Sequence, residues 1–253
     1  MSRLKGKIGF ELNVLVHDVF PENTIPAGVK IPAYNCVKRL FDKAYSQVDQ
    51  LIVLGRDMKH VVEEKIKRLN SLHKITIIEN WGDTQAISAM PFPSGKIKLQ
   101  YAGNIGRVQG LQRVVQQLPK DTELHIYGTG AMEETLKNMR CFNVFFHGPS
   151  SRSQQNEILA DCHIALVTLQ DGMYGLGVPS KTYNIMASGR PILYFGPSGS
   201  EIDLLIKEEG IGYCGWPEEW NVCVLQEMGC RARKLAEQRY SKPEILKRFL
   251  DTI

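Results

Sequence analysis

Short β-rich runs alternate with helical patterns along the whole chain, and this alternation leaves few folds open. Strands separated by helical segments are typical of parallel sheets joined by right-handed crossovers. In the first part, strands are expected at 12–16, 50–54 and 74–78, and helices at about 33–48 and 57–70. The second of these helices would open at Arg56-Asp57 and carry its charges on an outer face. The pattern therefore predicts a β-α-β-α-β unit.

A second α/β unit follows a segment that resembles a linker. Residues 79–96 contain Asn80-Trp81-Gly82-Asp83, two prolines and Ser94-Gly95, a composition typical of linkers. Beyond it, strands are expected at 99–102, 124–127, 144–146, 164–168 and 192–195, and helices at about 109–118, 131–139, 153–160, 180–188 and 200–209. The stretch from about 222 should be helical, with a fresh start near Pro243. We expect domains at 1–90 and 91–235, and a C-terminal helix at 236–253 that packs back toward the first unit.

Composition excludes several classes of protein. With 43% hydrophobic and 23% charged residues, the chain is ordinarily globular. Its net charge of +4 is too small and scattered for a nucleic-acid partner, although it would suit an anionic ligand or a membrane surface. The apolar stretches are strand-sized, and the start fails as a secretory signal, so a cytoplasmic protein without a transmembrane helix is expected. Seven basic residues between Arg231 and Arg248 form either a solvated helix face or a contact for anionic lipid.

Metal, hydrolase and P-loop chemistry find no support in the motifs. The six cysteines contain no C-x-x-C pair, and most are expected to be small buried hydrophobes. The histidines lack ligand spacing, so no metal site is expected. Neither a G-x-S-x-G elbow nor a G-x-x-x-x-G-K-[ST] loop is present, which argues against serine hydrolases and P-loop proteins.

Glycine turns recur at the carboxyl ends of the predicted strands in the second unit. They are Gly103-Asn104-Ile105-Gly106, Gly128-Thr129-Gly130 and Gly148-Pro149. In open α/β sheets ligands lie at this level, and glycines let the backbone approach an anion at a helix N-terminus. The same glycines can equally make only tight turns, so a phosphate cradle and a purely structural role both stay open.

Two further segments carry candidate chemistry. Gly175 to Lys181 joins glycines to Pro179, with Ser180 as an expected N-cap and Lys181 in a first helical turn, where positive charge is unfavourable. An anion would offset that charge, or the lysine points into water. His17-Asp18 closes the first strand, where the pair could act as acid/base groups, bind substrate, or form a structural histidine capped by aspartate.

In this order, the segments resemble the retaining glycosyltransferases of family 4, and most closely the branch that builds bacterial O-antigen, capsule and exopolysaccharide. The resemblance covers nearly the whole chain. It rests on His17 to Glu22, Glu79 to Asp83, Gly103 to Gly106, Ile126 to Gly130, Phe146 to Gly148, Ala160 to Cys162 and Val178 to Pro191.

The resemblance implies an α/β protein of GT-B type, with two Rossmann-like lobes built on parallel sheets. A nucleotide sugar would be held on the C-terminal lobe, facing the cleft. Because only three strands are legible in the N-terminal lobe, that lobe is expected to be incomplete, and a cut sheet should expose an edge and an apolar face. A truncated chain, a complementary chain or a homodimer would account for this.

The resemblance also assigns site residues. His17 would approach the transferred sugar and Lys181 would supply positive charge to the diphosphate, and these two are the catalytic candidates. The further donor-binding candidates are Gly103, Asn104, Ile105, Gly106, Arg107, Gly128, Gly130, His147, Gly148, Gly177, Val178, Pro179, Ser180 and Asn184. Leu176 and Asn184 stand where many members carry a glutamate pair, and Asn104 and Gln109 stand where basic residues are usual.

The function implied is transfer, with retention, of a sugar from a nucleotide diphosphate carrier to a lipid-linked glycan in surface polysaccharide synthesis. A UDP-sugar would be the donor, with no cofactor, and the enzyme would lie in the cytoplasm or at the inner face of the plasma membrane. Two alternatives stay open. One is a non-catalytic partner subunit or inactive fragment, which would bind no nucleotide; the other is a nucleotide-sugar epimerase, which would need no acceptor.

Overall fold

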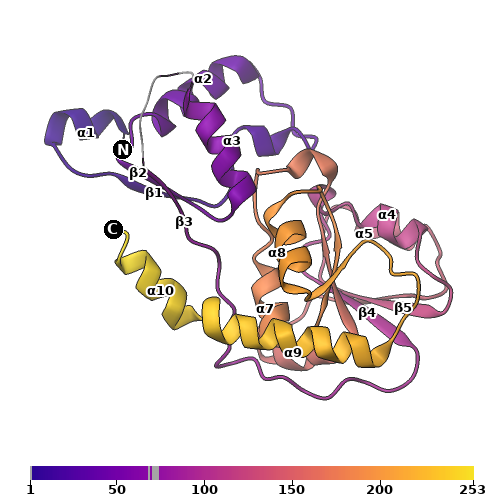
Figure 1. Cartoon of the computed structure of the whole chain (residues 1–253). Coiled ribbons are helices and arrows are strands. Elements are labelled where there is room, and N and C mark those ends of the chain that lie inside the picture. Colours follow the sequence, from indigo (N-terminus) through magenta and orange to yellow (C-terminus); the bar gives the residue numbers. More distant parts are fainter. Residues whose placement is uncertain (1, 68, 70–73) are drawn as a thin grey trace.

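The computed structural model describes residues 2–67, 69 and 74–253, which form two parallel sheets (Figure 1). The N-terminal lobe is built on the order β1-β2-β3, and the C-terminal lobe on β6-β5-β4-β7-β8-β9. The strands are β1 (Asn13–Val16), β2 (Gln50–Val53), β3 (Lys74–Ile77), β4 (Ile97–Ala102), β5 (Thr122–Tyr127), β6 (Val144–Gly148), β7 (Ile164–Thr168), β8 (Ile192–Phe195) and β9 (Gly212–Cys214). The predicted α/β class, parallel sheets and eight strands are confirmed, while β9 was not foreseen.

Helices connect the strands. They are α1 (Ser2–Ile8), α2 (Tyr34–Tyr45), α3 (Arg56–Lys67), α4 (Leu111–Gln116), α5 (Glu133–Lys137), α6 (Gln155–Ala160), α7 (Lys181–Ala187), α8 (Glu201–Glu209), α9 (Val222–Arg239) and α10 (Lys242–Leu250). Pro243 lies in the first turn of α10, as expected from its fixed φ. The helix predicted at 57–70 ends at Lys67, and its residues 68 and 70 lie outside the described ones. Helix α1 was not predicted.

The central strands β2 and β7 are buried at every position, in accord with the apolar runs at 51–53 and 164–167. In the C-terminal lobe, the order reverses between β4 and β7, because the chain leaves β6 and returns beside β4. Ligands of open α/β sheets bind at such a switch point. The carboxyl ends of β4 and β7 therefore mark where a site is expected.

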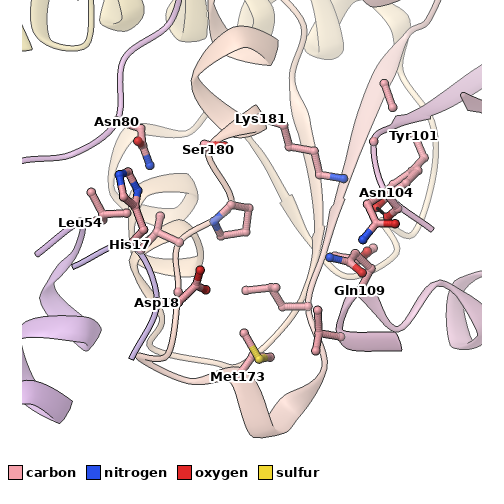
Figure 2. A pocket seen from close by; sticks show the side chains of 18 residues that line it. His17, Asp18, Leu54, Asn80, Tyr101, Asn104, Gln109, Met173, Ser180 and Lys181 are labelled. Atoms are coloured by element: carbon pink, nitrogen blue, oxygen red, sulfur yellow. Dashed lines mark hydrogen bonds between the residues drawn. The ribbon is translucent and has the colours of Figure 1, made fainter. Parts of the chain in front are cut away.

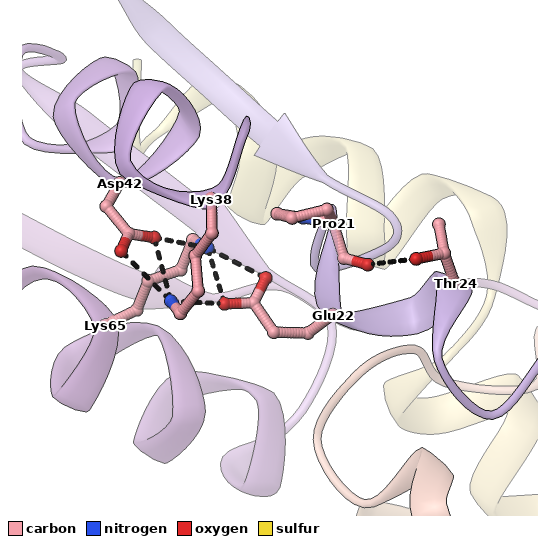
Figure 3. A network of polar contacts seen from close by, with 6 residues as sticks. All are labelled: Pro21, Glu22, Thr24, Lys38, Asp42 and Lys65. Atoms are coloured by element: carbon pink, nitrogen blue, oxygen red, sulfur yellow. Dashed lines mark hydrogen bonds and ion pairs between the residues drawn. The ribbon is translucent and has the colours of Figure 1, made fainter. Parts of the chain in front are cut away.

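Charges on α3 are not confined to an outer face, which corrects the sequence-based expectation. The Lys65 side chain is 2% exposed and pairs with Glu22 at 2.7 Å and with Asp42 at 2.6 Å, while Lys38 contacts the same two carboxylates (Figure 3). Asp57 is also buried. Burial raises the pKa of Glu22, but hydrogen bonds from Lys38 and Lys65 outweigh it and hold the pKa below its ordinary value. The network fixes the segment after β1 against α2 and α3.

The segment 79–96 has neither helix nor strand, as expected, and it is fastened to the C-terminal lobe. Arg190 donates to the carbonyls of Met90 and Pro91, and Arg233 donates to those of Thr84 and Ile87. The reading of the basic C-terminal stretch as a solvated face is therefore wrong for Arg233, whose guanidinium holds the linker.

Helix α10 lies beside the linker end of the N-terminal lobe. The Arg248 guanidinium pairs with Glu79 at 2.7 Å and donates to the carbonyl of Ile77 in β3 at 3.3 Å. The domain boundaries at 90 and 235 stay predictions. The N-terminal lobe exposes the large apolar side chains of Leu15, Ile25, Val29, Leu40 and Phe41.

The expectation that most cysteines are buried is wrong. Only Cys162 is buried and Cys141 is half-buried, while Cys36, Cys214, Cys223 and Cys230 are exposed, and all six are free. The exposed ones lie on α2 and α9 and at the end of the short strand β9, where the chain turns an outward side to solvent.

Candidate functional site

A cavity of about 400 Å³ lies between the two lobes, at the carboxyl ends of β1, β4 and β7. Figure 2 shows His17 and Asn80 on one side of it and Asn104 and Gln109 on the opposite side, with Lys181 between them. The complete lining is His17, Asp18, Leu54, Asn80, Tyr101, Ala102, Gly103, Asn104, Val108, Gln109, Thr168, Leu169, Met173, Gly177, Val178, Pro179, Ser180 and Lys181.

Lys181 begins α7, as predicted, and although the residue is only half-buried, its Nζ atom is shielded from water. Its Nζ atom lies 3.4 Å from the centre of the Tyr101 ring and has no hydrogen-bond partner in the described part of the chain. Burial lowers the pKa of Lys181 to about 7, because the charged ammonium loses its hydration. Ser180 holds the N-cap position, yet its side chain makes no capping hydrogen bond, which corrects that expectation. The amine is thus unpaired and close to the cavity's glycine turn.

Gly128 and Gly130, in the loop after β5, pack against the turn that follows β4. The N–H of Gly103 donates to the carbonyl of Tyr127, and that of Ile105 to the carbonyl of Thr129. A Cβ on Gly128 would lie 1.9 Å from the carbonyl oxygen of Gly103, so only glycine permits this approach. Gly130 is packed in the same way against Ile105. Both glycines therefore shape the turn from the side away from the cavity.

A second cavity, of about 310 Å³, shares Ala102, Gly103 and Lys181 with the first. Its other lining residues are Gln100, Ser150, Ser151, Gln155, Ile158, Leu159, Asn184 and Ile185. The Oδ1 atom of Asn184 accepts a hydrogen bond from the backbone N–H of Asp83, which leaves its amide group as the side-chain donor. Lys181 consequently lies in the wall between two compartments.

The N-terminal lobe contributes directly to the first cavity. Asp18 forms an isolated antiparallel bridge with Gly177, and the N–H of Val19 donates to the carbonyl of Leu176 at 2.9 Å. His17 and Asp18 thereby face the segment that leads to Lys181. Both are exposed, so a ligand in the cavity can reach them.

The structure brings most of the predicted site residues together, but not all. His17, Gly103, Asn104, Gly177, Val178, Pro179, Ser180 and Lys181 line the first cavity, and Asn184 lines the second. Ile105, Gly106, Arg107, Gly128, Gly130, His147 and Gly148 line neither. Ile105 is buried, and Arg107 is exposed outside both cavities.

His147 is placed away from the cavities for a visible reason. Its ring stacks on Tyr127 at 4.3 Å between centroids, and its Nε2 lies 2.9 Å from Nδ1 of His125. Alternation along β6 sends this side chain to the outer sheet face, while the turn at Gly148 stays at the strand end.

Sequence reasoning did not single out Tyr101, Asn80, Thr168 or Met173 as lining residues, and it noted Gln109 only as a replacement for a basic one. The signal that could have found Tyr101 and Thr168 is their position at the ends of β4 and β7. The Oε1 atom of Gln109 is buried and has no protein partner among the described residues.

Over the described residues, no three His, Cys, Asp or Glu side chains gather closely enough to hold a metal ion. In the same part of the chain, no helix has the length and apolar character needed to cross a membrane.

Two curated proteins are similar in sequence. WbjE of Pseudomonas aeruginosa, described as a glycosyltransferase, is 35% identical over 277 positions, which cover 97% of this chain and 68% of WbjE. WcaI of Escherichia coli K12, assigned by its description to colanic acid biosynthesis as a glycosyl transferase, is 25% identical over 240 positions, covering 81% of this chain and 57% of WcaI. The chain thus spans about two thirds or less of these relatives. No protein-family model matches it.

Solved structures share the fold at low sequence identity. Sucrose-phosphate synthase of Thermosynechococcus elongatus has a TM-score of 0.76 at 12% identity, covering 99% of this chain and 69% of that one. Anabaena HepE in complex with UDP and glucose has a TM-score of 0.67 at 11% identity, covering 99% and 73%. TarM has a TM-score of 0.68 at 17% identity, covering 96% and 50%.

Two parallel-sheet lobes with a cavity between them, together with these structural likenesses, define a protein of the GT-B class. The predicted GT-B fold is confirmed. The sequence relationship to WbjE then places the chain in a family: it belongs to the glycosyltransferases.

Proposed function

We propose that this chain transfers a sugar, with retention of configuration, from a nucleotide diphosphate sugar to a lipid-linked glycan during surface polysaccharide synthesis, as a member of glycosyltransferase family 4. The family relationship to WbjE supports sugar transfer, and the description of WcaI supports a polysaccharide product. The chain covers 68% of WbjE and 57% of WcaI, and the lipid-linked acceptor belongs to the proposal.

One observation carries the donor assignment: the buried, unpaired amine of Lys181 beside the glycine turn at Gly103. An ammonium in a dry site is costly unless an anion pairs with it. The Nζ atom would lie 3.8 Å from a Cβ placed on Gly103, so a phosphate at the turn would meet both backbone and ammonium. A diphosphate therefore suits the wall between the two cavities.

Each cavity would then bind a different part of the donor. The nucleoside would occupy the cavity near Ser150 and Gln155, and the sugar would occupy the inter-lobe cavity, where His17 and Asp18 face it. We take UDP as the nucleotide because HepE, a protein of the same fold, holds UDP and glucose in its structure. No cofactor or metal is invoked.

Catalysis in this proposal is electrostatic. When the sugar–phosphate bond breaks, negative charge grows on the diphosphate, and Lys181 is placed to stabilise it. His17 would orient the transferred sugar, while the acceptor hydroxyl attacks from the face that the diphosphate leaves. Asn104 and Gln109 offer uncharged amides on the opposite wall, so Lys181 is the cation among the described lining residues of the inter-lobe cavity.

The proposal includes a position at the inner face of the plasma membrane, in the cytoplasm. Helix α10 exposes Leu246 and Leu250 on one face, with Lys242 one turn before Leu246 on the same face. Apolar and basic groups together suit an anionic membrane surface. A complementary chain or second copy over the exposed apolar residues of the N-terminal lobe stays a prediction.

Thermal stabilisation by UDP, GDP, dTDP and ADP tests the donor site first. A ligand at 100 times its dissociation constant adds about 2.7 kcal/mol to folding stability. A selective shift with UDP supports the proposal, and release of UDP from a UDP-sugar only when a glycan acceptor is present would extend it to transfer. No shift with any nucleotide in a folded sample would favour a non-catalytic subunit.

A further inference from the structure

Helix α3 of the N-terminal lobe touches the C-terminal lobe at the segment that leads to Lys181. Asp57, in the first turn of α3, is 3% exposed, and its Oδ2 accepts a hydrogen bond from the backbone N–H of Gly175 at 3.2 Å. Its Oδ1 accepts one from Met58 within its own helix at 2.9 Å. One carboxylate thus joins the two lobes through backbone groups.

The contact is a close one, and glycine is required on both sides. A Cβ on Gly175 would lie 2.4 Å from Cγ2 of Val61 and 2.6 Å from the carbonyl oxygen of Asp57. A Cβ on Gly55, just before α3, would lie 2.7 Å from Cβ of Glu201. Because larger side chains would wedge the lobes apart, α3 and the C-terminal lobe can approach this closely only with glycine at both positions.

Asp57 and its neighbour Arg56 make different kinds of contact with the C-terminal lobe. Arg56 is 41% exposed and pairs with Glu201 at 3.0 Å and Glu208 at 2.8 Å, so it joins α3 to α8 from the outside. Asp57 has no basic partner among the described residues and uses backbone N–H donors instead. Burial raises the pKa of Asp57, and hydrogen bonds from the backbone of Met58, Glu201 and Gly175 oppose that rise.

The segment that Asp57 holds is also held on its other side. Gly177 bridges to Asp18, and the carbonyl of Leu176 accepts from Val19. Residues 175–177 therefore lie between two elements of the N-terminal lobe, and residues 177–181 form the cavity wall that ends in Lys181. A displacement at Gly175 would be carried along this short wall to the amine.

We infer that Asp57 is a positioning residue of the donor site: its carboxylate, through the Gly175 N–H, sets the place of the segment that ends at Lys181. This inference rests on the proposed function, because it assigns Asp57 to diphosphate binding without contact to the ligand. Arg56, in contrast, strengthens lobe contact without fixing that segment.

Three variants, Asp57→Ala, Asp57→Asn and Arg56→Ala, separate these roles. Amide hydrogen exchange of a peptide spanning residues 175–181 is measured without ligand, together with the Kd values of UDP and uridine. Loss of a hydrogen bond to a charged group predicts about tenfold faster exchange and about tenfold weaker UDP binding in Asp57→Ala, with uridine unchanged. Asp57→Asn should lie between wild type and Asp57→Ala, since its carbonyl oxygen can still accept. Arg56→Ala should match the wild type in both measurements.

Unchanged exchange of the 175–181 peptide in Asp57→Ala would overturn the inference, and so would an equal loss of UDP affinity in Arg56→Ala. If Asp57→Ala does not fold, Asp57→Asn decides by the same exchange measurement. If the wild type binds no nucleotide, the proposed function fails, whereas exchange still reports whether Asp57 fixes the segment.

Discussion

The Nζ atom of Lys181 lies 3.4 Å from the centre of the Tyr101 ring, and this contact places a buried amine between two cavities. A ring face attracts a cation but leaves its hydrogen-bond donors unused. The free protein thus keeps an amine whose best partner is absent from the described residues. An arrangement of this kind suits ligand binding better than stability.

Replacing Lys181 with methionine should make the protein more stable. The pKa of Lys181 is lowered to about 7, below its unfolded value of 10.5, so the unfolded state binds more protons between these pH values. The buried amine therefore lowers the free energy of unfolding most below about pH 7, and this destabilisation decreases as pH rises toward 10.5. We expect Lys181→Met to gain about 1–2 kcal/mol at pH 7, or about 2–8 °C in melting temperature by differential scanning calorimetry. A lower melting temperature would show that the amine has a partner.

Affinity for UDP should fall as pH rises above about 7. A bound diphosphate favours the charged amine, so binding above the pKa of about 7 takes up a proton at Lys181. Isothermal titration calorimetry in two buffers of different ionisation enthalpy measures this uptake directly at pH 8. The Lys181→Met variant is the control, since it should show no such uptake at the same pH. Equal uptake in both proteins would assign the proton to another group.

Alanine at Gly128 should disrupt the turn at Gly103. The added Cβ would lie 1.9 Å from the Gly103 carbonyl oxygen, at a φ of +132°. We expect a loss of at least about 2 kcal/mol and weaker UDP binding. Gly95→Ala is the matched control, because its φ is +97° but nothing lies within 4 Å, so it should cost about 1 kcal/mol and leave UDP affinity unchanged. Chemical denaturation of the two variants gives the comparison, and equal losses would contradict the packing argument.

Lys65 should matter more to the N-terminal lobe than Lys38. Both pair with Glu22 and Asp42, but the Lys65 side chain is 2% exposed and that of Lys38 is 31% exposed. Removing the buried ammonium leaves Glu22 and Asp42 with the more exposed Lys38 as their remaining cation among the described residues, so Lys65→Ala should cost about 3 kcal/mol. Lys38→Ala should cost about 1 kcal/mol or less, because solvent screens the pair. Equal unfolding free energies for the two variants would show that burial does not determine how much each lysine contributes to stability.

Acid should weaken the same network. The pKa of Glu22 lies below its ordinary 4.5, so its contribution is complete above that value and is lost as pH falls through the folded pKa. The free energy of unfolding, measured from pH 6 downward, should decline less steeply in Glu22→Gln than in the wild type. Parallel curves would remove Glu22 from the acid response.

Much of the fold could be predicted because parallel sheets leave a strong pattern in sequence. The buried runs at 51–53 and 164–167 are continuous and apolar, and they lie in the central strands β2 and β7. Strand β9 could not be predicted, since it has three residues, one of them Gly212, and depends on pairing with β8. Helix α1 was missed because its start looked only like a short basic segment.

Site residues at strand ends could be predicted from the sequence. Those whose side-chain position depends on tertiary contacts were harder to predict. Gly103 directly follows β4, and Lys181 is the first residue of α7. Both line the inter-lobe cavity, as the sequence predicted. His147 also follows the pattern of a strand-end residue, but stacking on Tyr127 holds its ring on the outer sheet face. The role of Asp57 was invisible in sequence, because its partner Gly175 is 118 residues away.

The most direct test of the account is the Kd of UDP and of uridine for wild type and Lys181→Met at pH 7. We predict that the wild type binds UDP more tightly than uridine, and that Lys181→Met binds UDP at least about tenfold more weakly while its affinity for uridine is unchanged. Equal UDP affinity in the two proteins would contradict the assignment of the diphosphate to the wall between the two cavities.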